Sequence, residues 1–173
     1  MLHAEPIPYA LYSTLVMTAE TVPRKAVGLF NYSVSADIPG TAHAATKADT
    51  NLVRSGAVGL PQEWSMWIHG WRAQSNTALG GAFWNWAAHT SAQFTYRGTS
   101  AFTSPLLDLL HGVRPTHAPK DAFAVRLTEQ QSFDVVLEPA PKAVVAALQR
   151  HIKFAGELRV TVYLDGALQR TVV

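Results

Sequence analysis

The side chains of this chain that could do chemistry are its seven histidines, its serines and its twelve acidic residues. Histidine metal sites start from two ligands at a short fixed spacing, His-x-His on a strand or His-x-x-x-His on a helix. Neither spacing occurs, and the closest pair, His111 and His117, flanks a loop that contains a proline. The sequence therefore predicts no metal site.

Catalytic nucleophiles have no supporting pattern either. The chain has no cysteine, which excludes disulfides, thiol catalysis and cysteine-bound zinc. No Gly-x-Ser-x-Gly turn is present to activate a serine, and the acidic residues are scattered over the whole length. Gly80-Gly81 precedes aromatic residues rather than a basic helix start, so it does not indicate a phosphate loop. We therefore expect no enzyme activity, no catalytic residues and no cofactor.

Five tryptophans are gathered between Trp64 and Trp86. Packing in the core or at a subunit interface is the favoured interpretation, because tryptophan buries a large apolar area. A sugar-stacking platform of a carbohydrate-binding module is an alternative, and it would need exposed, coplanar Trp67 and Trp71. Insertion at a membrane interface is a third interpretation.

The composition narrows the class of protein. Hydrophobic residues make up 48% and charged residues 15%, which is the balance of a folded chain. The formal net charge is +2, and the 14 lysines and arginines form no run of the kind that neutralises nucleic acid. The sequence has no stretch of about 20 apolar residues, so it predicts no membrane-spanning helix. The first residues lack the pattern of a signal peptide. We expect no direct contact with nucleic acid.

The elements that would position these side chains are mainly strands. Turn signals recur with short apolar stretches between them, which is typical of a sandwich or barrel. Strands are predicted at residues 9–17, 27–34, 63–71, 122–127 and 132–138. Within the strand at 63–71, Trp64, Met66 and Ile68 share one face, and Trp67 and Trp71 share the other.

Two short helices are predicted between strands. A run of leucines follows Pro105 and ends before Gly112, and proline at the start with glycine past the end is typical of a helix. Val144, Leu148 and Ile152 recur at helical spacing, which favours a second helix over residues 143–154.

The other segments are predicted from turn chemistry and spacing. Residues 41–59 are small and polar, and we expect a long loop with a helical turn near residues 48–54. The segment 82–96 carries aromatic residues, of which Phe94 and Tyr96 have strand spacing.

The end of the chain alternates over residues 158–164 and again over 167–173, with Asp165-Gly166 between the two runs. This pattern predicts a hairpin in which Tyr163 faces Leu168 and Val160 faces Thr171. The elements together predict an all-β chain with one domain, residues 1–173. We expect a single jelly-roll β-barrel or sandwich of about eight antiparallel strands, with one or two short helices in loops.

Two blocks of sequence carry a resemblance. The first covers residues 29–71 and contains Thr46-Lys47-Ala48-Asp49-Thr50-Asn51-Leu52, followed by Gly59-Leu60-Pro61. The second joins residues 133–137 with the closing run RVTVYLDGALQRTV, residues 159–172. Together they resemble the small single β-barrel major capsid proteins of tailless icosahedral bacteriophages with an internal membrane, most closely those that infect Thermus. The helical stretch at 143–154 is longer than the turn that this family has there.

The resemblance implies a structural role. Proteins of this family assemble as dimers or larger homo-oligomers and tile an icosahedral shell together with a second, larger major capsid protein. It implies a place in the virion capsid, assembly in the host cytoplasm and peripheral contact with an internal lipid membrane.

The surfaces that would join such subunits can be suggested from the residues. The strand at 9–16 is apolar on both faces and starts near the free terminus. It could therefore pair with a neighbour's sheet or exchange with it, or be an ordinary strand of its own barrel. The subunit-interface candidates are Tyr9, Leu11, Tyr12, Leu15, Val16, Trp67 and Trp71.

Overall fold

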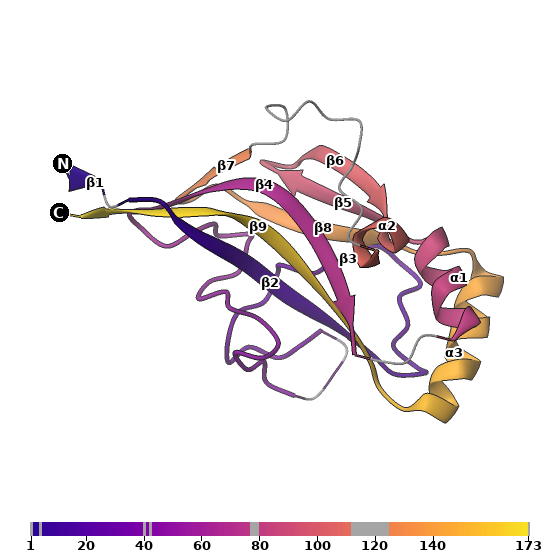
Figure 1. Cartoon of the computed structure of the whole chain (residues 1–173). Helices are drawn as coiled ribbons and strands as arrows, with labels where there is room; N and C mark the ends of the chain where they lie inside the picture. The colour runs from indigo at the N-terminus through magenta and orange to yellow at the C-terminus, as the bar shows by residue number, and fades with distance from the viewer. Residues whose placement is uncertain are drawn as a thin grey trace.

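The computed structural model describes residues 2–3, 5–39, 41, 43–76, 80–111 and 125–172, which fold mainly into β-strands. Two antiparallel sheets pack face to face as a sandwich, and three helices gather at one end of it (Figure 1). The strand β1 and the last residues of β9 lie at the opposite end (Figure 1). The all-β sandwich is confirmed, with three helices in the described residues where one or two were expected.

The two sheets each have four strand positions. The first has the order β2, β9, β4, β7, and β1 continues the position of β2 along β9. Its strands are β1 (Leu2–His3), β2 (Ile7–Met17), β4 (Trp64–Ser75), β7 (Val125–Thr128) and β9 (Leu158–Val172). The second has the order β3, β8, β5, β6. Its strands are β3 (Val27–Gly28), β5 (Ser91–Tyr96), β6 (Thr99–Pro105) and β8 (Phe133–Glu138).

The connections between the strands define the topology. From β2 to β9, each step along the chain crosses to the other sheet, except the hairpin of β5 and β6. Counted from β2, the first sheet takes the first, eighth, third and sixth strands, and the second takes the second, seventh, fourth and fifth. This interleaving of two Greek keys is the topology of a jelly roll. The predicted fold class is confirmed.

The core lies between the sheets and is built by period-two alternation. In β9 every second side chain from Leu158 to Leu168 is buried, and the same holds from Phe133 to Leu137 in β8. These side chains join one apolar cluster that also includes residues of the helices. Its largest fully buried members include Trp86, Phe30, Phe83, Phe94, Met17 and Leu29.

Helices close one end of the sandwich. The helices α2 (Leu106–Leu110) and α3 (Lys142–Ala155) match the two predicted ones, although Gly112 lies outside the described residues. The helix α1 (Gly81–His89) was not predicted. It buries Phe83, Trp86 and Ala87, a spacing of three and four residues that fits a helix with one apolar face. The strand spacing of Phe94 and Tyr96 is confirmed in β5.

The strand predicted at residues 27–34 is wrong beyond Gly28. The Asp134 carboxylate accepts hydrogen bonds from the backbone N–H of Phe30, at 2.7 Å, and of Val135, at 2.8 Å. Burial raises the pKa of Asp134, and these N–H donors oppose the rise by stabilising the charged form. A side chain therefore binds the backbone where a neighbouring strand would, and the ladder with β8 ends.

The hairpin predicted at Asp165-Gly166 is also wrong, because both residues lie inside β9. The strand β9 pairs with β2 on one side and β4 on the other across this position, so Tyr163 does not face Leu168. A Cβ on Gly166 would lie 2.1 Å from the Trp67 carbonyl oxygen. The glycine therefore permits close approach of two strands instead of a turn.

The two faces predicted for residues 63–71 hold only at the start of β4. The pairing with β9 shifts register between Ile68 and Gly70, which is a β-bulge. The extra residue changes the phase of the alternation, so Trp71 turns inward and is only 4% exposed. Trp67 stays on the outer face, and the prediction that the two tryptophans share a face is wrong.

The other predictions agree with the structure where it describes the chain. The strands at 9–17 and 132–138 correspond to β2 and β8, and the strand at 122–127 overlaps β7, with 122–124 outside the described residues. The described residues within 41–59 form the expected long loop, with turns and isolated bridges. The Asp49 and Thr50 N–H groups both donate to the Thr46 carbonyl, so one turn of helical type lies at 46–50, slightly before the expected 48–54.

Candidate functional site

The interface candidates of the sequence are divided between core and surface. Leu11, Leu15 and Trp71 belong to the core between the sheets. Val16 is buried in a second cluster on the outer face of β2, with Tyr32, Ile38 and Ala45 of the following segment. Tyr9 and Tyr12 are half-buried, and Trp67 is 41% exposed. The candidates do not form one continuous surface, and their role in subunit contact stays a prediction.

The tryptophans are mostly packed against other side chains. Trp86 is buried, Trp84 lies at a tilt against the His111 ring with the centroids 5.0 Å apart, and Trp71 meets a phenylalanine of β6 edge-on at 4.8 Å. Trp64 is partly buried and lies under an arginine. Only Trp67 of the five is exposed. The exposed pair of Trp67 and Trp71 that a flat sugar platform would need is not formed.

Arginines and aromatic rings alternate on the outer face of the first sheet. The Arg126 guanidinium lies 5.5 Å from the centre of the Trp67 ring. The Arg72 guanidinium lies 3.9 Å from the centre of the Tyr163 ring, and its Nε is 3.1 Å from an Asp165 carboxylate oxygen. In such pairs the negative face of the ring attracts the cation. Aromatic and arginine side chains are also the types enriched in protein–protein interfaces.

The free edge of β2 is covered by side chains of the long loop. The Tyr12 N–H donates to Asn51 Oδ1 at 2.9 Å, and Asn51 Nδ2 donates to the Ala10 carbonyl at 2.7 Å. The Thr50 hydroxyl donates to the Tyr12 carbonyl at 2.9 Å. One amide side chain thus imitates a strand partner, donating and accepting at adjacent positions of the edge.

The same edge is completed by Tyr32. Its hydroxyl donates to the Thr14 carbonyl at 2.6 Å and accepts from the Thr14 N–H at 3.1 Å. Burial raises the pKa of the Tyr32 hydroxyl, which keeps the proton that this double role requires. We call Tyr32, Thr50 and Asn51 the edge clasp. It occupies five backbone groups of β2 that an edge strand would otherwise offer to another chain.

An ion pair fixes the loop that carries the edge clasp. Arg159 of β9 donates to Asp49 Oδ1 at 2.7 Å and to Glu157 at 2.6 Å. Burial of the Asp49 carboxyl disfavours its charge, but hydrogen bonds from the Thr46 N–H and hydroxyl and the nearby Arg159 lower its pKa below the ordinary value. Asp49 is therefore an ionised anchor that ties the turn at Thr46 to the sheet.

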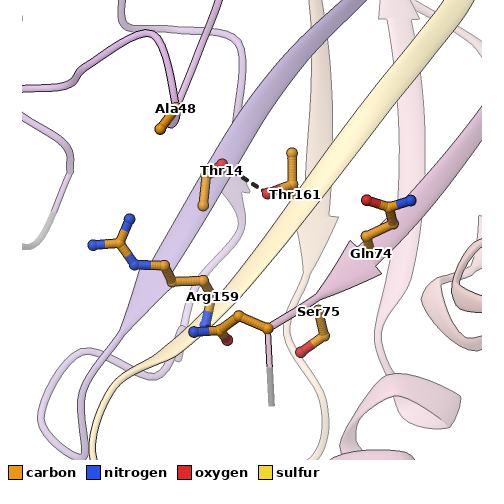
Figure 2. A pocket seen from close by; sticks show the side chains of 7 residues that line it. Thr14, Ala48, Gln74, Ser75, Arg159 and Thr161 are labelled. Carbon is orange, nitrogen blue, oxygen red and sulfur yellow. Dashed lines mark hydrogen bonds between the residues drawn. The ribbon is translucent and has the colours of Figure 1, made fainter.

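A polar hollow of about 180 Å³ lies beside this ion pair (Figure 2). Its walls come from β2, β9, the end of β4 and the loop at Ala48. Thr14 and Thr161 join across its floor by a hydrogen bond of 2.8 Å, and Arg159 extends along its side toward the loop (Figure 2). Its lining has hydroxyl, amide and guanidinium groups but no histidine, so it lacks a base next to a nucleophile.

The histidine and acidic side chains are dispersed over the part of the chain that the structure describes. No three histidine or acidic side chains there come close enough to hold a metal ion. Within the same residues, no helix is long and apolar enough to cross a membrane.

The sequence did not identify the edge clasp as a functional element. Its residues Thr50 and Asn51 belong to the block at 46–52, which drew attention only through its resemblance. Comparison of the chain with known protein families, with curated proteins and with solved structures finds no match.

Proposed function

We propose that this protein is a structural subunit of an icosahedral virus shell. In this role it self-associates and tiles the shell around an internal membrane, together with a second, larger major capsid protein. It acts in the virion and is assembled in the host cytoplasm. The proposal assigns the chain no catalytic step and no cofactor.

The observation that supports the proposal most is the interleaved order of the two four-stranded sheets. Jelly rolls of this kind occur in viral capsids, and also in lectins and in cupin enzymes. Fold alone does not select among these roles. The capsid-like blocks in the sequence favour the shell, and one of them, residues 46–52, carries two of the three edge-clasp residues.

The surface chemistry agrees with contacts between proteins. The outer face of the first sheet presents arginines and aromatic rings already paired with one another, which limits the entropy lost when another surface covers them. Shell contacts are individually weak, and each subunit makes several of them. A sheet face of this kind fits that requirement better than a deep pocket does.

Sedimentation velocity of the purified chain over a wide range of concentration tests the proposal. We expect dimers or larger assemblies to increase with concentration, and Trp67→Ser to weaken them because Trp67 is the exposed interface candidate. Val53→Ser removes an apolar side chain of the long loop that is more exposed than Trp67, at 69% against 41%, and serves as the control. A monomer at every concentration, with vesicles present or absent, would overturn the proposal.

A jelly-roll carbohydrate-binding module is the second candidate, and exposed Trp67 with Arg126 beside it is the observation that favours it. Sugar stacking on Trp67 would change tryptophan fluorescence during a polysaccharide titration. The Trp67→Ser variant would lose that change. A monomer that responds in this way would favour the module over the shell subunit.

A further inference from the structure

The helical end of the sandwich holds an open hollow of about 560 Å³. It lies between α3 and the turn that follows β2, and its lining comes from both segments. Arg24 of the turn and Arg150 and Lys153 of α3 supply three cations, against one carboxylate from Glu20. We call this feature the α3 hollow.

The three cations of the α3 hollow have no acidic partner in the described residues. The ion pairs among the described residues are all formed by Arg72 and Arg159, which lie on the outer face of the first sheet. Lys153 lies in the last turn of α3, where a cation interacts favourably with the helix dipole. The dipole does not account for Arg24, which belongs to the turn after β2 and lines the same hollow.

An aromatic side chain adjoins these cations. Phe154 is 94% exposed, the most exposed large apolar side chain among the described residues. It follows Arg150 by four residues on α3, so the two lie on neighbouring turns of one helix face. The buried face of α3 is formed by Val145, Leu148 and Ile152. Phe154 therefore adds nothing to the core.

We propose that the α3 hollow and Phe154 form a surface that binds an anionic lipid bilayer. Lipid headgroup phosphates would enter the hollow, and the Phe154 ring would insert between the headgroups. This inference rests on the proposed function, and it identifies the helical end of the sandwich as the end that faces the internal membrane. The opposite end, with β1 and the end of β9, then faces away from the membrane (Figure 1).

Charge and apolarity together favour a bilayer over other anionic partners. Lysine and arginine near an anionic membrane surface are attracted by its negative potential. An apolar side chain on a basic helix face gains further by entering the interface between headgroups and acyl chains. A DNA duplex would use the cations, but it could take up the Phe154 ring only by unstacking a base step, which costs free energy.

Vesicle co-sedimentation tests this surface with the intact protein. Wild-type chain is mixed with vesicles of neutral lipid alone, or of neutral lipid with phosphatidylserine, and with duplex DNA in a separate arm. We expect binding to the anionic vesicles, little binding to neutral ones, and loss of binding at high salt. The double variant R150Q/K153Q should bind about 30-fold more weakly, from about fivefold for each charge near the surface. Phe154→Ser should weaken binding about tenfold.

Matched controls distinguish binding through this surface from nonspecific effects of net charge and of exposed apolar side chains. The variant K47Q/R54Q removes two cations from the exposed long loop, and Val53→Ser removes an exposed apolar side chain there. Both should bind vesicles like the wild type. Equal losses in both charge variants, no binding to anionic vesicles, or binding to DNA alone would each overturn the inference.

The lipid test and the self-association test can fail separately. Sedimentation velocity without lipid is run on the same variants, and R150Q/K153Q should assemble like the wild type. Assembly without vesicle binding would overturn the membrane surface and leave the proposed function standing. Vesicle binding by a protein that never assembles would overturn the shell role instead.

Discussion

The substitution Asn51→Ala tests the edge clasp most directly. Asn51 makes two hydrogen bonds with the backbone edge of β2, one from the Tyr12 N–H and one to the Ala10 carbonyl, and its Nδ2 also donates to the Tyr9 hydroxyl at 3.2 Å. Each such bond contributes about 1 kcal/mol to stability, and the backbone groups left behind are partly shielded from water. We therefore expect the free energy of unfolding to fall by about 2 kcal/mol. For a chain of this size that lowers the melting temperature by about 4–8 °C.

Chemical denaturation measures the total loss, and native-state hydrogen exchange locates it. The Tyr12 N–H should exchange faster in the variant, because opening of the loop is no longer needed to expose it. Asn51→Asp keeps an acceptor for the Tyr12 N–H but puts a carboxylate oxygen opposite the Ala10 carbonyl, so it should lose at least as much stability as Asn51→Ala. Arg54→Ala changes an exposed side chain of the same loop and should stay within about 0.5 kcal/mol of the wild type.

The exposed edge gives the experiment a second readout. An unprotected edge strand pairs readily with other chains, so Asn51→Ala should also aggregate more at high concentration. Unchanged stability together with unchanged exchange at Tyr12 would refute the clasp, because it would mean that water satisfies the edge equally well.

Two further predictions follow from the first sheet. Gly166→Ala should destabilise the fold by about 3 kcal/mol in urea titrations, because its Cβ would meet the Trp67 carbonyl oxygen. Gly70→Ala should be near neutral, because nothing lies within 4 Å of its Cβ. Equal effects of the two substitutions would exclude close approach of the strands as the cause. Asp49→Asn should cost roughly 1–2 kcal/mol at neutral pH. Since the native pKa of Asp49 is lowered below its ordinary 3.8, its contribution is present above that value and lost as the pH falls through the native pKa. The difference from the wild type should therefore shrink in acid, and a difference independent of pH would show that the charge with Arg159 is not involved.

Local patterns predicted the elements whose environment is simple. The alternation of Phe133, Val135 and Leu137 identifies β8 because one face packs on the core and the other does not. The helical spacing of Leu148 and Ile152 identifies α3 for the same reason. These segments could be assigned because the spacing of the apolar residues within each segment shows which of its side chains are buried.

The hairpin predicted at Asp165-Gly166 is wrong for a physical reason, and part of that reason can be seen in the sequence. A two-residue turn would place Leu168 opposite Tyr163, on the polar side of the strand. In the structure Leu164 and Leu168 both lie inward, and the alternation passes through the Asp-Gly pair without a change of phase. The unbroken phase favoured one long strand, and pairing on both sides of β9 outweighed the local turn preference.

The bulge in β4 could not be predicted in this way. Trp67 and Trp71 stand four residues apart, which in a regular strand means the same face. The shift between Ile68 and Gly70 is a property of the pairing with β9, and its one local sign in residues 63–71 is Gly70, because a glycine inside a strand often marks a bulge. The sugar-platform hypothesis depended on that regularity, and one inserted residue removed its geometry.

The edge clasp changes how contacts between copies of this chain are to be understood. The strand β2 already pairs with β9 along its whole length inside its own chain, so the structure shows it as an ordinary strand of one sandwich. A neighbour that added a strand at residues 10–14 would first have to displace Tyr32, Thr50 and Asn51 and break five hydrogen bonds. Each hydrogen bond contributes about 1 kcal/mol net to stability, and the incoming strand would only form equivalent hydrogen bonds in place of those that it breaks. Strand exchange at this part of the edge therefore gains little. If the chain has the shell role that we propose, its copies should associate through side chains on the outer face of the sheet instead.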